Sequence, residues 1–265
     1  MNDTSQPDLS IVIPCYNDGP YLIQALESIK LYKGTYKIEI IIVDDGSDHI
    51  ETIEILKNLS DTSSLKIIKC KNNGLSFARN MGFAASTSPF IIPLDSDDII
   101  NHEILDSALN LIKSDDSLDI IYGDCEYFQE KTGVSIKKMD EFSQFYVNCL
   151  NATALIKKST WERIGGYDES MKEGYEDWDL WLRMLSVGAR FEKINSVFFK
   201  YRIKSNSMVK ETIKKHDKIS SYIQKKNIKY FNSQYIKLHR ELKEIKNNRR
   251  LLVKFLIRNL LGKTN

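Results

Sequence analysis

Short apolar runs that alternate with segments of helical spacing constrain the fold of this chain more than any other feature. The runs cover residues 9–14, 38–43, 65–69 and 90–94 and are rich in isoleucine, valine and leucine. A polar turn ends each run, and apolar residues then recur every three to four positions. This alternation predicts an α/β fold with a mostly parallel, doubly wound central sheet flanked by helices.

Carboxylates gather where two of these runs end. Asp44 and Asp45 follow the second run, and Asp95, Asp97 and Asp98 follow the fourth. Ligands of such sheets bind beyond the carboxyl ends of the strands, so a shared site is expected there. Asp95 and Asp97 leave an extended strand end on the same side and can converge on one Mg²⁺ or Mn²⁺. The alternative is a solvated acidic turn in which Asp98 favours the start of a helix.

The regular alternation stops near residue 122, and the rest of the first 208 residues predicts an α+β arrangement that closes over the first half. A cap at Ser159 and a stop at Gly165-Gly166 bound a short helix. The other expected elements are a hairpin in residues 122–133, a strand in 152–156, a helix in 175–184 and a strand in 197–201.

Charge separates residues 1–208 from residues 209–265. The second part holds sixteen Lys or Arg against four Asp or Glu, a net charge of +12, which leaves −10 for the first part of a chain with net charge +2. We expect a catalytic domain over residues 1–208 and a basic helical tail over residues 209–265. Residues 249–263 mix basic residues with leucines. Such a helix suits an anionic membrane surface, and oligomerisation is the alternative.

Cysteine spacing and the N-terminus favour a cytoplasmic protein, peripheral on the cytoplasmic face of a membrane if the tail binds there. The four cysteines lack CxxC spacing, which argues against a zinc site or a disulfide framework. Residues 1–8 are polar, without the basic and apolar regions of a signal peptide, and no run of 18 apolar residues occurs. Nothing in residues 1–208 indicates binding to nucleic acid.

Six short motifs stand in order along residues 9 to about 208. They are SIVIPCYN at 10–17, VDDGS at 43–47, NG at 73–74 with ARNMG at 78–82, LDSDD at 94–98, GGYDE at 165–169 and EDWDL at 176–180. Together they resemble the family 2 glycosyltransferases of GT-A fold. The resemblance implies an inverting hexosyl or related transferase that uses a nucleoside diphosphate sugar, expected to be a UDP-sugar. The acceptor would be a glycan or a lipid-linked glycan, as in bacterial members that build polysaccharides of the cell envelope.

The resemblance also implies roles for residues at the strand ends. The residues expected to contact the nucleotide are Pro14, Tyr16, Asp44, Asp45, Arg79 and Asp95. Asp45, with Asp44, would face the base, and Asp95 would face the ribose. Asp97 would ligate Mn²⁺ or Mg²⁺ that bridges the two phosphates and offsets charge on the departing nucleoside diphosphate. Capping of the next helix is the alternative role of Asp45.

Asp177 is the expected general base. Sugar hydroxyls are poor nucleophiles, and a carboxylate in hydrogen-bond reach contributes about 10²–10⁴-fold to the rate. Glu176, Trp178 and Asp124 are expected to contact the sugar, the acceptor or the diphosphate. The alternatives are first-turn helix acids for Glu176 and Asp177 and core packing for Trp178.

Lys204 marks a departure from the family pattern, which often has a histidine two residues beyond the arginine of Tyr201-Arg202. A charged lysine cannot ligate a metal, but its ammonium can offset phosphate charge, so we expect Lys204 at the diphosphate. Two other functions stay open. One is a non-catalytic module that binds a sugar nucleotide or glycan. The other is a nucleotidyltransferase, which is less favoured because residues 15–20 lack the basic residue of a phosphate-binding loop.

Overall fold

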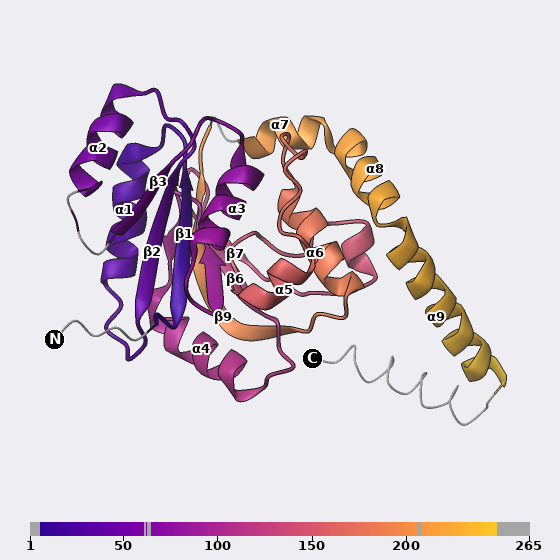
Figure 1. Ribbon diagram of the computed structural model, residues 1–265. Helices are drawn as coiled ribbons and strands as arrows, with labels where there is room; N and C mark the ends of the chain where they lie inside the picture. Colours follow the sequence, from indigo (N-terminus) through magenta and orange to yellow (C-terminus); the bar gives the residue numbers. More distant parts are fainter. Residues whose placement is uncertain (1–5, 61, 63–64, 206–207, 248–265) are drawn as a thin grey trace. The chain divides into compact units, whose positions relative to one another are not determined.

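The computed structural model describes residues 6–60, 62, 65–205 and 208–247 (Figure 1). Its chain forms two compact units, Met1–Ser220 and Ser221–Asn265. The division falls within α8 (His216–Lys226), beyond the boundary at residue 208 that charge suggests. The helix α7 (Met208–Lys214) therefore belongs to the first unit.

The four apolar runs form parallel strands, as the sequence predicts. They are β1 (Leu9–Cys15), β2 (Ile38–Asp44), β3 (Leu65–Lys69) and β4 (Phe90–Pro93). Their order in the sheet is β3-β2-β1-β4, with Cys15 paired to Asp44 and Val12 paired to Pro93. All seven residues of β1 are buried, because this strand has neighbours on both sides and layers on both faces. The acidic segments after β2 and β4 thus leave the same edge of the sheet.

Helices cover both faces of this sheet. The helices of the first half are α1 (Gly19–Lys30), α2 (Ile50–Ser60), α3 (Leu75–Ala85) and α4 (Leu105–Ser114). Ile11 and Ile13 of β1 share one core with apolar residues of α1, α2 and α4, whereas Val12 shares another with α3 and α6 (Glu176–Ser186). Gly82 lets α3 approach β1 closely, since a Cβ there would lie 2.2 Å from Val12 Cγ1.

The second half extends the sheet with strands of mixed direction. They are β5 (Ile99–Ile100), β6 (Ile120–Gln129), β7 (Gly133–Ser135), β8 (Leu155–Lys157) and β9 (Phe191–Ile203), in the order β3-β2-β1-β4-β8-β6-β9-β5 with β7 beside β6. β8 is antiparallel to both β4 and β6, and β9 is parallel to β6. The sheet is therefore less uniformly parallel than the first half suggests. β9 is also longer than the expected strand, because it pairs with both β6 and β5.

The expected cap at Ser159 is wrong, and the alternative role of Asp98 at the start of a helix is not observed. Lys157, not Ser159, precedes α5 (Lys158–Arg163), and no side chain caps it. Asp98 does not begin a helix, because β5 follows it and α4 starts only after the short 3₁₀ helix His102–Ile104. The expected stop after α5 is confirmed, since Gly165 and Gly166 have φ of +76° and +75°.

The second unit contains the end of α8 and the helix α9 (Ile228–Asn247). No described helix is long and apolar enough to cross a membrane. Residues 249–263, for which the sequence predicts a membrane-surface or oligomerisation helix, lie outside the described residues.

Candidate active site

The ends of β1 and β2 place one open aromatic ring beside two buried carboxylates. Pro14 is buried within β1, whereas the Tyr16 side chain that follows is 45% exposed. Asp44 Oδ1 accepts a hydrogen bond from the Ser47 backbone N–H at 2.9 Å, and Asp45 accepts from the backbone N–H groups of two residues before α3. Of the residues expected to contact a base, Tyr16 offers the most surface to a ligand.

Asp45 shapes the loop before α3 and does not cap the next helix, α2. Its Oδ1 accepts from the Asn73 N–H at 2.9 Å and its Oδ2 from the Gly74 N–H at 2.8 Å. Gly74 has φ of +93°, which favours glycine there. A carboxylate has about four lone-pair sites, so Asp45 keeps acceptor capacity for a ligand donor.

Arg79 is buried between the two halves of the site. Its guanidinium is 1% exposed, with Nη2 2.6 Å from Asp95 Oδ1 at the end of β4 and Nη1 donating to Glu176 at the start of α6. Burial lowers the pKa of Arg79, but Asp95 and Glu176 outweigh this and raise it well above its usual value. Arg79 is the side chain that the sequence predicts to contact the nucleotide. Because it binds Asp95, it would act on a nucleotide through that carboxylate. Glu176 is 5% exposed and is occupied by the same ion pair.

Lys204 extends from the end of β9 to the acidic turn. Its Nζ lies 2.7 Å from Asp97 Oδ2, 3.5 Å from Asp18 Oδ1 and 4.7 Å from the Tyr21 ring centroid. Burial and the neighbouring Asp95 raise the pKa of Asp97, and Lys204 opposes this rise. A lysine from the far end of the domain therefore supplies the positive charge that the loop after β1 lacks.

Arg202 fixes the acidic turn against β9. Its backbone N–H donates to Asp98 Oδ1 at 2.9 Å, and its Nε donates to the Asp97 carbonyl at 2.7 Å. Asp98 is 1% exposed, and burial, followed by the charges of Asp95 and Asp97, raises its pKa well above the usual value. Asp98 thus supports the turn from inside the protein.

The acidic turn suits a divalent cation only if a ligand supplies most of the coordination. Arg79 binds Asp95, Arg202 binds the buried Asp98, and the described residues contain no group of three or more metal-ligating side chains. Asp97 is paired with Lys204 and its side chain is 21% exposed, so it is one carboxylate of the turn that a ligand-bound ion could reach. Oxygen ligands suit Mg²⁺ and Mn²⁺, so the residues fit an ion shared between Asp97 and phosphate oxygens.

Asp177 lies in the first turn of α6, held by two neutral donors. Its Oδ1 accepts from the Trp178 backbone N–H at 2.8 Å and its Oδ2 from Asn148 Nδ2 at 3.0 Å. Burial, followed by the charge of Glu176, raises the pKa of Asp177 to about 7. A general base works best when its pKa lies near the working pH, so this carboxylate suits proton acceptance at neutral pH.

Trp178 and Asp124 both make contacts within the protein. Trp178 is fully buried, stacks on His216 at 6.1 Å and donates from Nε1 to the Gln144 carbonyl at 2.5 Å. This placement agrees with the packing alternative. Asp124 Oδ1 accepts from the Lys137 N–H at 2.8 Å and lies 2.7 Å from Lys193 Nζ, where β6 and β9 lose regular register.

The sequence did not single out Asp18 or Asn148. Asp18 sits in a polar turn where an acid carries no distinctive signal, and its neighbour Lys204 is remote in sequence. Asn148 lies in residues 122–160, which contain no recognisable motif. Their only signal is their spatial proximity to Asp97 and Asp177.

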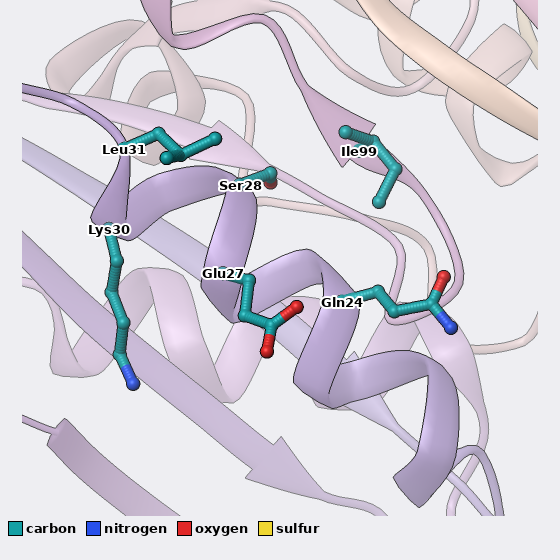
Figure 2. A pocket seen from close by; sticks show the side chains of 6 residues that line it. All are labelled: Gln24, Glu27, Ser28, Lys30, Leu31 and Ile99. Atoms are coloured by element: carbon teal, nitrogen blue, oxygen red, sulfur yellow. The ribbon is translucent and has the colours of Figure 1, made fainter.

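A separate depression of about 530 Å³ lies beside α1 and β5 (Figure 2). Its lining residues are Gln24, Glu27, Ser28, Lys30, Leu31 and Ile99. None of these is a predicted site residue. Gln24 connects it to the acidic turn only indirectly, because its Oε1 accepts from Arg202 at 2.8 Å.

The curled α/β sheet with carboxylates at its strand ends is a GT-A fold. S. aureus TarS in complex with UDP-GlcNAc has this fold, with a TM-score of 0.63 and 18% identity over 77% of this chain and 60% of that chain. The mannosyltransferase PcManGT from Pyrobaculum calidifontis, in complex with GDP-Man and Mn²⁺, gives a TM-score of 0.60 and 17% identity over 77% and 59%.

Residues 10–177 match the family model for glycosyl transferase family 2, and the chain belongs to this family. A curated relative is an uncharacterized glycosyltransferase from Rickettsia typhi, 29% identical over 227 residues, 78% of this chain. This chain spans 65% of that relative and 64% of a similar protein from Rickettsia prowazekii.

Proposed function

We propose that this glycosyltransferase is an inverting hexosyl or related transferase that moves a sugar from a nucleoside diphosphate sugar to a hydroxyl of a glycan or lipid-linked glycan. The observation that carries the proposal is the buried Arg79, whose guanidinium binds Asp95 at the strand end and Glu176 beside Asp177. One residue thereby connects the expected donor side with a carboxylate suited to proton acceptance.

The donor is proposed to lie at the ends of β1, β2 and β4. The complexes of TarS with UDP-GlcNAc and of PcManGT with GDP-Man support a nucleoside diphosphate sugar, and a UDP-sugar is the first candidate. Tyr16 offers an exposed ring to the base, while Asp44 and Asp45 accept from its N–H groups. Asp95, held by Arg79, accepts from the ribose hydroxyls.

The diphosphate is proposed to meet Asp97 and Lys204. Asp97 would hold Mn²⁺ or Mg²⁺ together with phosphate oxygens, and a bound ion supplies Lewis-acid stabilisation of the departing diphosphate. The Lys204 ammonium, 2.7 Å from Asp97, adds a fixed positive charge at the same place. This charge reduces the need for another protein ligand.

Asp177 is proposed to accept the proton of the acceptor hydroxyl. The hydroxyl oxygen forms its bond to the anomeric carbon as the bond from that carbon to the diphosphate oxygen breaks. The proton stays on Asp177 and the bonding pair leaves with the nucleoside diphosphate. A single displacement inverts the configuration of the anomeric carbon and needs only one carboxylate base.

Transfer assays with the full chain test this proposal. UDP- and GDP-sugars are incubated with Mn²⁺ and glycan or lipid-linked glycan acceptors, and the released nucleoside diphosphate is measured. We expect Asp177→Asn to lower kcat by about 10²–10⁴-fold while UDP binding, measured by calorimetry, is retained. Asp115→Asn, at an exposed ion pair with Arg190, is the control and should leave kcat unchanged.

Other outcomes identify the alternatives. Donor binding without release in any acceptor condition favours a non-catalytic binding module. Release of pyrophosphate from a nucleoside triphosphate favours a nucleotidyltransferase.

The basic tail is proposed to bring residues 1–208 to the cytoplasmic face of an anionic membrane. The support is the composition of residues 249–263, in which five basic residues stand among leucines and other apolar residues. Flotation with anionic vesicles compares the full chain with a chain ending at residue 248. Equal flotation of the two chains would contradict membrane binding through the tail. If the full chain forms an oligomer in solution and the shortened chain does not, oligomerisation through the tail is favoured.

A further inference from the structure

The segment of residues 143–149 lies against α6 and is fixed there by Gln144. Gln144 is fully buried, although it is polar. Its backbone carbonyl accepts from Trp178 Nε1 at 2.5 Å, and its Oε1 accepts from the Cys149 N–H at 2.9 Å. Buried amides with satisfied hydrogen bonds hold a backbone in one arrangement. The segment is therefore anchored to the helix that carries Asp177.

Asn148 connects this anchor to Asp177. Its Oδ1 accepts from Gln144 Nε2 at 3.3 Å, and its Nδ2 donates to Asp177 Oδ2 at 3.0 Å. The first contact directs the amide oxygen of Asn148 toward Gln144, so the amide nitrogen faces the carboxylate. A chain of two amides thus ends on Asp177.

The other groups around Asp177 do not provide this directional contact. Arg79 lowers the pKa of Asp177, yet its guanidinium binds Glu176 and Asp95. Glu176 raises the pKa of Asp177 through its charge. The charge of Asp177 contributes to the raised pKa of three tyrosine hydroxyls, those of Tyr167, Tyr175 and Tyr201. In the part of the chain that the structure describes, Asn148 supplies the side-chain donor to Asp177.

We propose that Asn148 is a positioning residue for the general base, holding Asp177 Oδ2 so that the remaining lone pairs face the acceptor hydroxyl. This inference rests on the proposed role of Asp177. The amide is neutral at all working pH values, so it donates to the carboxylate without competing for the proton. A hydrogen bond to the charged form also favours ionisation, which lets the base act at lower pH.

The pH dependence of transfer by Asn148→Ala tests the proposal. A hydrogen bond to a charged group is worth about 1.5–3 kcal/mol, and about 1.4 kcal/mol corresponds to one pH unit. We expect the ascending limb of the kcat–pH profile to move up by about one unit or more, with roughly tenfold lower kcat at neutral pH. The KM for the donor should stay unchanged. Asn148→Ser, which keeps a donor, should restore part of the shift.

Two measurements separate positioning from a structural defect. The melting temperature and UDP affinity of Asn148→Ala should match those of the wild type, and Asn110→Ala, an exposed amide on α4, is the matched control. A loss of kcat that is equal at every pH, or no loss at all, would overturn the proposal.

A carboxyl titration by NMR makes the inference independent of transfer. The Asp177 resonance is assigned with Asp177→Asn, and its pKa is compared between the wild type and Asn148→Ala. A higher pKa in the variant supports the contact, even if no acceptor is turned over and the proposed function fails. An unchanged pKa in a folded variant refutes the role of Asn148 while leaving the transferase proposal intact.

Discussion

The strand ends and the start of α6 hold their carboxylates by different means. Asp95 and Asp97 at the strand ends are paired with the basic side chains Arg79 and Lys204, at 2.6 and 2.7 Å. Asp177 on α6 instead accepts from a backbone N–H and a neutral amide. Fixed positive charge suits the binding of a nucleoside diphosphate. Neutral donors combined with partial burial suit a group that must gain and lose a proton.

The substitution with the largest expected effect removes Arg79, the residue that contacts both regions. Arg79→Met leaves Asp95 and Glu176 without their shared cation, which should lower the free energy of unfolding by about 3–5 kcal/mol. Urea unfolding of the full chain measures this change. Arg190→Met, at an exposed ion pair, should cost at most about 1 kcal/mol. Similar losses in the free energy of unfolding for both variants would show that Arg79 does not hold the two regions together.

A second test concerns binding at the strand ends alone. Asp45→Asn removes charge from a carboxylate that orders the loop before α3 and is proposed to meet the base. Loss of a hydrogen bond to a charged group should weaken UDP binding by about 1.5–3 kcal/mol, which calorimetry would detect. Asp177→Asn should leave this affinity unchanged. If both variants weaken UDP binding equally, donor binding at the strand ends and proton acceptance on α6 are not separate roles of the two regions.

The pH dependence distinguishes the regions in another way. Asp177 must be ionised to accept a proton, so kcat should rise about tenfold per pH unit below about 7 and then level off. Folding stability changes with pH in the opposite direction, because a carboxyl whose pKa is raised in the folded protein favours its neutral form. Its contribution to folding is full below the unfolded pKa and is lost as the pH rises through about 7. Asp177→Asn should remove this slope from pH-dependent unfolding curves.

The smallest expected effect is at Lys204. Lys204→Met removes a partly exposed ammonium, and we expect a loss of about 1 kcal/mol in UDP affinity, roughly fivefold, that shrinks at high salt. UDP binding by the variant should also depend more on Mn²⁺. Lys200→Met, which breaks an exposed pair with Glu126, is the control and should bind UDP as the wild type does. An effect that does not vary with salt would argue against a role of charge.

The parallel half of the fold follows from the sequence because its two central strands, β1 and β4, are buried along their whole length. These two strands read as mostly apolar runs, and the acids after β2 and β4 mark the edge of the sheet. The two-residue strand β5 leaves no such pattern, and its pairing with β9 depends on residues far away in the chain. The antiparallel insertion of β8 between β4 and β6 is also a tertiary choice that local spacing does not encode.

The same limit applies to the site. Motif order places Asp95, Asp97 and Asp177 near a common edge, because each stands at the end of a strand or the start of a helix. Full burial of Arg79 could not be predicted, since it needs Glu176 from a distant segment. Asn148 is beyond sequence reasoning for a related reason, because one amide in an irregular segment has meaning only through the carboxylate it meets.

Arg79 also makes the intervening polypeptide a closed loop in space. Asp95 and Glu176 end on one guanidinium, so everything between them leaves from and returns to a single point. Residues inserted or deleted in the connections between the strands and helices of that segment need not displace either end. Connections within this segment can therefore differ in length while Asp95 and Glu176 keep their separation.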